Sequence, residues 1–229
     1  MLAARLKSVF NQFGVREGLY YLAAKALSAA SRGHITFIRY HFVAQPVPET
    51  STPGNRTSAK STVRLVSPGD PVVASFPRPA EVIANRFANG STCFVAETNG
   101  RFSGFLWLAH GAYEEDEVRC RYVLADPSRC AWDYDVYVEP DFRIGRTFSR
   151  LWEAANTHLA SEGVRWSLSR ISAFNPASLA AHRRLGIRKV ATASFLKCGR
   201  LQLSALDRRP YLHLSLSARR PVLRLSPPH

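Results

Sequence analysis

The clearest alternation of apolar and polar residues lies in the middle of the chain. Residues 133–138 read Asp-Tyr-Asp-Val-Tyr-Val, and this alternation of aromatic and β-branched residues with polar ones predicts a β-strand. The strand should end soon afterwards, because Pro140 has no N–H to donate and Gly145 permits a left-handed turn. Apolar residues then recur at helical spacing up to residue 162, and Thr147 can cap this helix. The pattern therefore predicts a strand, a turn and a helix in direct succession.

A similar succession follows further along the chain. Residues 164–173 read as a strand, and residues 175–187 open with Asn-Pro and close on Leu-Gly, which are helix start and stop signals. Upstream, residues 92–96 and 102–110 flank the turn pair Asn99-Gly100, which predicts a β-hairpin. We also predict a helix at 79–89 and strands at 63–66, 118–124, 189–197, 201–206 and 211–216.

The beginning of the chain has a different pattern. Residues 2–13 and 15–32 each carry an apolar stripe and several basic residues, which predicts two short helices separated by Gly14. Residues 35–47 then read as a strand. Residues 1–32 can lie on an anionic membrane surface, or pack against the domain or a second subunit of a homodimer. Two alanine-rich stripes favour packing.

Two segments of biased composition set the expected domain organisation. Residues 49–62 are rich in Ser, Thr, Pro and Gly, which is typical of a flexible linker. Residues 217–229 are basic and proline-rich and predict a disordered tail. The expected organisation is an N-terminal segment at 1–48, the linker at 49–62, a main domain at 63–216 and the tail at 217–229.

An acidic run lies between two of the predicted strands. Residues 114–117 are all Glu or Asp, which is typical of a solvated loop tip. An alternative interpretation is a patch that attracts a cationic substrate.

The composition limits the class of protein. No apolar run approaches the ~20 residues of a membrane-spanning helix. The four cysteines lack the spacing of metal ligands, so we predict isolated thiols, no metal and a cytoplasmic protein, with a peripheral position on the membrane as an alternative. A net charge of +14 favours the capture of an anionic ligand. Nucleic acid ranks lower, because the arginines form no recognisable nucleic-acid motif.

The basic turn is the first candidate site. It carries Arg143 and Arg146 directly before a predicted helix. Free N–H groups and the positive end of the helix dipole would face the same anion as the two side chains. The turn therefore predicts a phosphate-binding site.

Three sequence blocks carry a resemblance to a known family. They are Val-Tyr-Val-Glu-Pro-Asp-Phe-Arg at 136–143, the block at 175–187 with Asn-Pro-Ala-Ser and Leu-Gly-Ile, and the hairpin at 93–106. In this order and spacing they resemble the GNAT superfamily of acyl-CoA-dependent N-acyltransferases, over about residues 63–206. The resemblance implies an α/β fold with a mixed, mostly antiparallel central sheet flanked by helices, here with an N-terminal helical appendage.

The first block departs from the family pattern. With Arg143 aligned on the family's arginine, Arg146 and Phe148 occupy the positions of the first glycine and the second small residue, and Gly145 lies one position early. Side chains there would crowd a pyrophosphate, so the motif is degenerate. His182 stands where the family usually has tyrosine.

The resemblance implies the ligand-binding residues. The strand at 133–138 would part from its neighbour, so that backbone groups near its end bind the pantetheine amides and polarise the thioester carbonyl. The pyrophosphate would lie on the basic turn, with Ser178 reaching it and Asn175 marking the pantetheine or acceptor edge. The implied residues are Val136, Val138, Arg143, Gly145, Arg146, Thr147, Phe148, Asn175 and Ser178.

Two residues are candidates for proton transfer. His182 can both accept and donate a proton near neutral pH. Strict alternation places Tyr134 on one face of the strand and Asp133 and Asp135 on the other. The resemblance implies that the face of Tyr134 approaches the acceptor. We therefore predict His182 and Tyr134 as the catalytic residues.

The sequence favours an N-acyltransferase that uses acetyl-CoA or a longer acyl-CoA and acts on an amine, such as an envelope sugar or a small molecule. One alternative is a non-catalytic GNAT-like binding or assembly subunit, because the phosphate turn is degenerate. The other is a basic nucleic-acid-binding protein, which ranks last.

Overall fold

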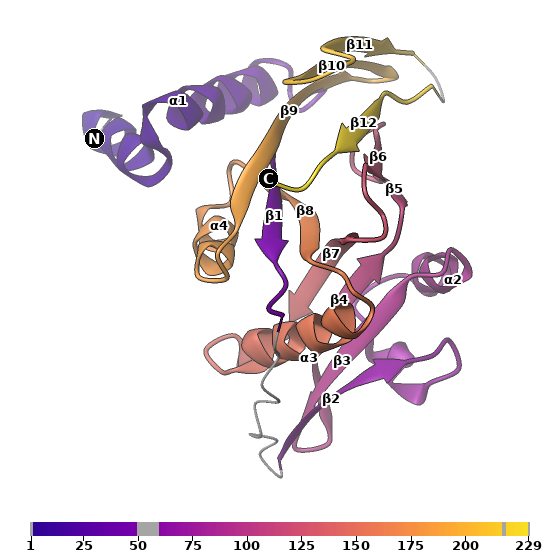
Figure 1. Ribbon diagram of the computed structural model, residues 1–229. Helices are drawn as coiled ribbons and strands as arrows, with labels where there is room; N and C mark the ends of the chain where they lie inside the picture. The colour runs from indigo at the N-terminus through magenta and orange to yellow at the C-terminus, as the bar shows by residue number, and fades with distance from the viewer. Residues whose placement is uncertain (1, 50–59, 217–218, 229) are drawn as a thin grey trace. The chain divides into compact units, whose positions relative to one another are not determined.

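The computed structural model describes residues 2–49, 60–216 and 219–228. The chain forms two compact units, each built from segments that are distant in sequence (Figure 1). Unit 1 comprises Met1–Gln45, Tyr113–Ala125 and Ser169–His229, and unit 2 comprises Pro46–Ala112 and Asp126–Leu168. The fold is mixed α/β with mostly antiparallel strands, as predicted. Residues 50–59, most of the predicted linker, lie outside the described residues.

Unit 2 contains an antiparallel sheet in the order β2-β3-β4-β7, with the first residues of β8 parallel to β7. Its strands are β2 (Ser61–Val66), β3 (Thr92–Thr98), β4 (Arg101–Ala109), β7 (Cys130–Val138) and the start of β8 (Trp166–Ser172). Its helical elements are η1 (Pro71–Ser75), α2 (Ala80–Ala88), η2 (Pro140–Phe142) and α3 (Thr147–Ser161).

Both faces of the unit 2 sheet are covered. On one face, Ile83 of α2 packs with Phe105 and Trp107 of β4. On the other face lies α3. The centroid of its His158 ring is 5.5 Å from the centroid of the Phe94 ring on β3. The hairpin predicted around Asn99 and Gly100 is confirmed, with positive φ angles of 53° and 71° at the two turn residues.

Unit 1 contains strands in the order β11-β10-β9-β1-β8 and a small sheet in the order β12-β6-β5. Its elements are α1 (Leu2–Ala30), β1 (Ile35–Pro46), β5 (Ala112–Glu114), β6 (Arg121–Leu124), the end of β8, α4 (Pro176–Arg183), β9 (Arg188–Cys198), β10 (Leu201–Leu206), β11 (Leu212–Ser215) and β12 (Val222–Leu225). Among the described helices, none is long and apolar enough to cross a bilayer.

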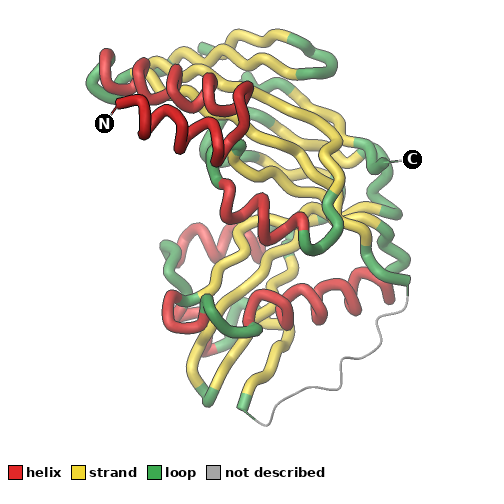
Figure 2. Tube along the Cα trace, turned by 90° about the vertical axis from the view of Figure 1, so that its left-hand side faces the viewer, coloured by secondary structure: helices red, strands yellow, loops and turns green. Residues whose placement is uncertain are grey.

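The N-terminal segment is part of unit 1. Helix α1 bends at Gly14, where φ is 75°, and Figure 2 shows its two helical parts. Glu17 accepts a hydrogen bond of 2.8 Å from Arg39 on β1, and Tyr20 stacks on Phe37 at 5.8 Å. Strand β1 pairs with β9 along its length. The structure therefore differs from the predicted separate segment at 1–48, because long-range strand pairing inserts this segment into a sheet.

The predicted disordered tail at 217–229 is also different in the structure. Residues Val222–Leu225 form β12, which pairs in parallel with β6. Leu223 and Leu225 are fully buried. Burial of these two leucines explains why a short basic segment is ordered.

One residue of the acidic run is buried, in contrast to the predicted solvated loop tip. The Glu115 side chain is 0% exposed and accepts two hydrogen bonds of 2.7 Å from Arg170 on β8. Desolvation raises the pKa of Glu115, while the hydrogen bonds from Arg170 oppose that rise. Arg170 also lies over the Tyr40 ring at 4.5 Å. This bidentate pair joins the acidic loop to the sheet of unit 1.

Removal of one partner should reveal the cost of the buried charge. We expect Arg170→Leu to lower the free energy of unfolding by about 3–5 kcal/mol at neutral pH, since Glu115 would be left unpaired. A carboxyl whose pKa is raised by folding stabilises the folded state at low pH, and this contribution is lost as the pH rises through the folded pKa. The loss of unfolding free energy in Arg170→Leu, relative to the wild type, should therefore become smaller as the pH falls from about 7.5 to about 5.5. Urea unfolding at both values measures it.

Two variants serve as controls. The double variant Glu115→Leu/Arg170→Leu should recover most of the loss, because both charges are removed together. Arg121→Leu breaks an exposed pair with Glu114 and should cost about 0–1 kcal/mol. Equal stability of Arg170→Leu and wild type would contradict the interpretation.

Candidate active site

A bulge in β7 shapes the candidate site in unit 2. The register of β4 and β7 pairs Phe105 with Tyr137 but Trp107 with Tyr134, so two residues of β7 oppose one residue of β4. Asp135 lies in this bulge with φ of 48°, a left-handed conformation. Tyr134 and Tyr137 consequently pack on the same hydrophobic cluster. The predicted strict alternation is therefore wrong beyond Asp135, because the bulge shifts it by one residue.

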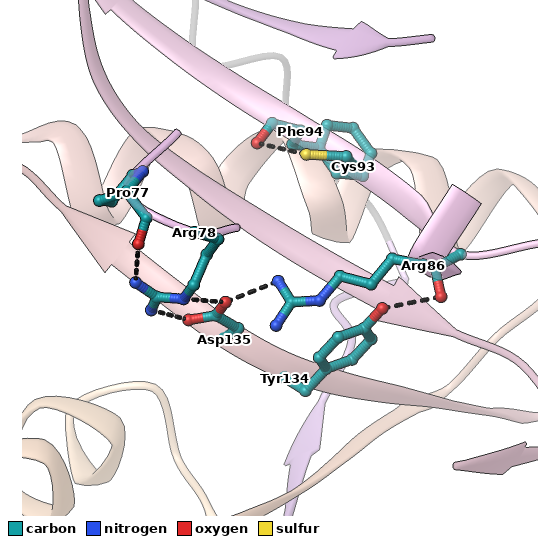
Figure 3. A network of polar contacts seen from close by, with 8 residues as sticks. Pro77, Arg78, Arg86, Cys93, Phe94, Tyr134 and Asp135 are labelled. Atoms are coloured by element: carbon teal, nitrogen blue, oxygen red, sulfur yellow. Dashed lines mark hydrogen bonds and ion pairs between the residues drawn. The ribbon is translucent and has the colours of Figure 1, made fainter. Parts of the chain in front are cut away.

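Two arginines hold the bulge in place. Arg78 donates 2.9 Å from its Nε to Asp135 and makes a second bond through Nη2, while Arg86 of α2 donates 2.6 Å to the same carboxylate (Figure 3). The three side chains form what we call the Asp135 clamp. The two ion pairs offset the strain of a non-glycine residue at positive φ. The Asp135 carboxylate is thus paired with two arginines within unit 2.

Tyr134 lies beside the Asp135 clamp (Figure 3). Its hydroxyl donates a 2.7 Å hydrogen bond to Ser91. Burial is the main cause that raises the pKa of Tyr134 to about 12. At neutral pH the phenol is therefore protonated, which suits a hydrogen-bond donor and not a base.

The end of β7 is the part of the strand for which ligand contacts were predicted. The parallel ladder with β8 covers only Cys130–Trp132 against Trp166–Leu168, whereas β7 continues to Val138. Near this end, the backbone of β4 comes unusually close: a Cβ added to Gly104 would lie 2.4 Å from the Tyr137 carbonyl oxygen. Gly104 is therefore required by the approach of the two strands, a role that the sequence did not reveal.

The basic turn runs directly from β7 into α3. Residues 143–146 are exposed, and the carbonyl oxygen of Val138 accepts a 3.1 Å hydrogen bond from Arg143. The helix N-cap is Arg146, which provides no side-chain hydrogen bond to the first turn. The N–H groups at the start of an α-helix have no intrahelical partners, so those of α3 are suited to binding an anion.

Two details of the turn correct the predictions. Thr147 is the first residue of α3 and is buried, so it does not cap the helix. Gly145 is not in the left-handed region; its N–H donates to the Phe142 carbonyl oxygen at 3.1 Å, and an added Cβ would lie 3.2 Å from that oxygen. The turn is built from consecutive tight hydrogen-bonded turns, which do not need positive φ. Phe148 is half-buried, with its ring 6.5 Å from that of Trp152.

The remaining predicted residues lie on α4 in unit 1. Asn175 is the N-cap of α4 and accepts a 3.0 Å hydrogen bond from the Ser178 N–H. His182 is buried, and its Nδ1 lies 2.9 Å from the Ser178 carbonyl oxygen. Because a carbonyl only accepts, Nδ1 carries the proton of a neutral ring, which assigns Nε2 as the acceptor atom. Unit 2 contains Tyr134, Val136, Val138 and the turn at 143–148.

The sequence model of the acetyltransferase (GNAT) family matches residues 61–187, which is more than half of the chain. These residues include β7, the basic turn and α4. No curated protein matches the chain.

Several solved structures have a similar fold. A protein from Novosphingobium aromaticivorans, described as an acetyltransferase of the GNAT family, is 15% identical with a TM-score of 0.45, over 69% of this chain and 62% of its own. A Drosophila protein is 15% identical with a TM-score of 0.49, over 79% of this chain and 58% of its own. A tandem GNAT protein of clavulanic acid biosynthesis is 16% identical with a TM-score of 0.47, over 72% of this chain and 55% of its own. The chain thus spans less than two thirds of each structure, and the similarity concerns the fold alone.

The Asp135 clamp can be tested through stability. We expect Asp135→Asn to lower the free energy of unfolding by about 1–3 kcal/mol, because asparagine tolerates positive φ but removes the charge shared by two arginines. Asp135→Leu should cost more, because it adds backbone strain at the same position. Urea unfolding measures both. As a matched control, Glu97→Gln weakens a more exposed pair with Arg64 and should cost about 0–1 kcal/mol. Equal losses in Asp135→Asn and Glu97→Gln would exclude a special role for the clamp.

Proposed function

The chain belongs to the GNAT acetyltransferase family, and we propose that it transfers an acyl group from acyl-CoA to an amine. The observation that carries this proposal is the arrangement within unit 2. A bulged strand leads, through a turn with two exposed arginines, into a helix whose first turn has no side-chain cap. In this arrangement the strand end suits the pantetheine and the helix start suits the pyrophosphate. The donor is proposed to be acetyl-CoA or a longer acyl-CoA.

The residues of the turn fit a diphosphate despite the degenerate motif. Arg143, Arg146 and Arg150 supply positive charge around the start of α3, and the first turn of α3 contains no acidic residue. Phe148 and Thr147 are packed away from solvent to different degrees, whereas Arg143 and Arg146 are exposed together with Ile144 and Gly145. The N–H groups at the start of α3 and the helix dipole add to this attraction. The ligand would be held by charge and backbone N–H groups in place of a glycine cradle.

Acyl transfer needs a polarised carbonyl and a proton for the departing thiolate. Backbone groups of β7 near Val136 are proposed to bind the thioester carbonyl oxygen and stabilise its developing charge. A neutral amine would then attack the carbonyl carbon, the C–S bond would break, and the thiolate would take up a proton. His182 is the proposed proton carrier, and Tyr134, which keeps its proton at neutral pH, is proposed to act as a donor and not as a base. The acceptor is proposed to be an amine on a small molecule or a sugar.

Ligand binding tests the phosphate turn directly. Calorimetric titration with acetyl-CoA, a longer acyl-CoA and free CoA should show micromolar binding of at least one of them. Arg143→Ala and Arg146→Ala should each weaken binding about tenfold, equivalent to about 1.4 kcal/mol, since each removes a charge next to the diphosphate.

Arg165→Ala is the matched control for these variants, because Arg165 follows the other end of α3 and pairs with Glu49. It should leave CoA affinity unchanged. Absence of binding to all three ligands would reject an acyl-CoA enzyme and favour a non-catalytic member of the family.

The proton carrier has a separate test. We expect His182→Ala to lower turnover by about 10²–10⁴-fold while the acyl-CoA affinity stays nearly constant, because proton transfer acts on the transition state. Steady-state kinetics with an amine acceptor, combined with calorimetry, separates the two effects. His158→Ala replaces another helical histidine, which pairs with Glu162 at 3.3 Å, and should keep its turnover. Full turnover in His182→Ala would remove this residue from the mechanism.

A further inference from the structure

The outer face of the β10–β11 hairpin in unit 1 inverts the usual distribution of apolar and polar residues. Leu203 and Leu214 are 41% and 59% exposed, and they lie opposite each other in the register. Their neighbours Gln202, Ser204 and Ser215 are fully buried. A strand with one solvated face normally turns its leucines inward and its polar residues outward. We call this exposed apolar face the leucine face; it comprises Leu201, Leu203, Leu212, Leu214 and Leu216.

Hydrogen bonds on the buried side fix this orientation. The Gln202 side chain accepts 2.8 Å from the Arg119 N–H, donates 2.8 Å to the Arg119 carbonyl oxygen, and donates 3.0 Å to Ser204. A shift of one residue along the strand would bury the leucines, but it would also break these bonds and expose the polar residues. Exposure of the leucines is therefore specified by the buried polar side.

The leucine face continues a surface that is covered elsewhere in unit 1. The strand register aligns Phe37, Leu196, Leu203 and Leu214 in one row across β1, β9, β10 and β11. Tyr20 of α1 covers the Phe37 end of the row. Phe37 and Leu196 are half-buried, whereas exposure increases at the two outer strands. The uncovered end of an otherwise covered face is typical of a docking surface.

The charge of the chain indicates what can cover it. Unit 1 contains 20 lysines and arginines against 6 aspartates and glutamates, and unit 2 contains 11 against 11. The entire net charge of +14 therefore lies on unit 1. After residue 196 the only acidic residue is Asp207. Arg200 precedes Leu201, and Arg208 and Arg209 lie in the turn that leads to Leu212. Both ends of the hairpin thus carry arginine.

A basic groove lies next to the turn of the hairpin. It has a volume of about 610 Å³ and is lined by Arg208, Arg209, Pro210, Val222 and Arg224. Three guanidinium groups beside exposed apolar side chains match the chemistry of lipid head groups and the acyl chains below them.

We propose that the leucine face docks unit 1 on an anionic lipid surface. Leucines enter the boundary between head groups and acyl chains, while the arginines at the hairpin ends contact the acidic head groups. A second copy of the chain is a poorer occupant, because it would bring two surfaces of the same strong positive charge together. Nucleic acid would use the arginines but not five exposed leucines, which offer no planar group for base stacking. The proposal is independent of acyl transfer.

Vesicle flotation of the full chain tests the proposal. The probe is a vesicle of phosphatidylcholine with about one third phosphatidylglycerol, compared with phosphatidylcholine alone. The wild type should float with the anionic vesicles, and added salt should weaken binding. Replacement of Leu203, Leu212 and Leu214 by threonine, which keeps the preference for strands, should reduce binding at least about tenfold. Leu65→Thr, which changes an exposed leucine of β2 in unit 2, should bind as the wild type does.

Several results would overturn the proposal. They are failure of the wild type to float with anionic vesicles, equal flotation of the triple variant, and loss of flotation only when Val15 and Leu19 of α1 are replaced by serine. Concentration-dependent dimers that the triple variant abolishes, without vesicle binding, would assign the face to a second copy. Salt-resistant binding of an oligonucleotide in place of vesicles would assign it to nucleic acid.

A native thiol gives a second readout that needs no change to the leucines. Cys198 is exposed and pairs with Leu201 in the register, whereas Cys93, Cys120 and Cys130 are buried. An environment-sensitive fluorophore on Cys198 should shift to shorter wavelength when anionic vesicles are added. The same fluorophore on Leu65→Cys, in a Cys198→Ser background, should not shift. Equal shifts at both positions, or no shift at Cys198, would contradict docking through the leucine face.

Discussion

The ion pairs of Asp135 with Arg78 and Arg86 are the constraint on which the candidate site depends. A non-glycine residue at φ of 48° in a strand is costly unless its surroundings hold it there. The two arginines come from α2 and the segment before it, so they also hold that helical layer on the sheet. Because the bulge shifts the alternation of β7, the Asp135 clamp decides which side of the sheet each later residue faces. The course of β7 into the basic turn follows from it.

Unit 1 uses a related device for a different purpose. Glu115 and Arg170 form a buried bidentate pair, which holds a loop of acidic residues against β8. Such a pair adds little net stability compared with apolar packing, but loss of one partner is costly. It therefore restricts the loop to one arrangement. In both units, arginines that contribute to the positive charge of the sequence are paired with a carboxylate.

Local patterns in the sequence predicted much of the fold, and contacts between distant residues account for the rest. The hairpin at Asn99-Gly100, helix α3 and the break at Gly14 follow from short-range chemistry and were predicted. The bulge at Asp135 was not, because it depends on arginines that lie far away in the chain. The placement of β1 beside β9 and the pairing of β12 with β6 are also long-range effects. The residues proposed for CoA were located by resemblance, and the buried state of Thr147 and the conformation of Gly145 needed the structure.

The positive net charge is divided unevenly between the two units, which composition alone could not show. A basic chain that binds a polyanionic ligand would be expected to collect its charge around the ligand site. Here unit 2, which contains the proposed diphosphate turn, is neutral overall, because its arginines are balanced by carboxylates such as Asp135. Local arrangement at the start of α3 must then supply the attraction for a diphosphate. The surplus charge on unit 1 needs another explanation, and it coincides in that unit with leucines whose outward orientation is fixed by buried hydrogen bonds.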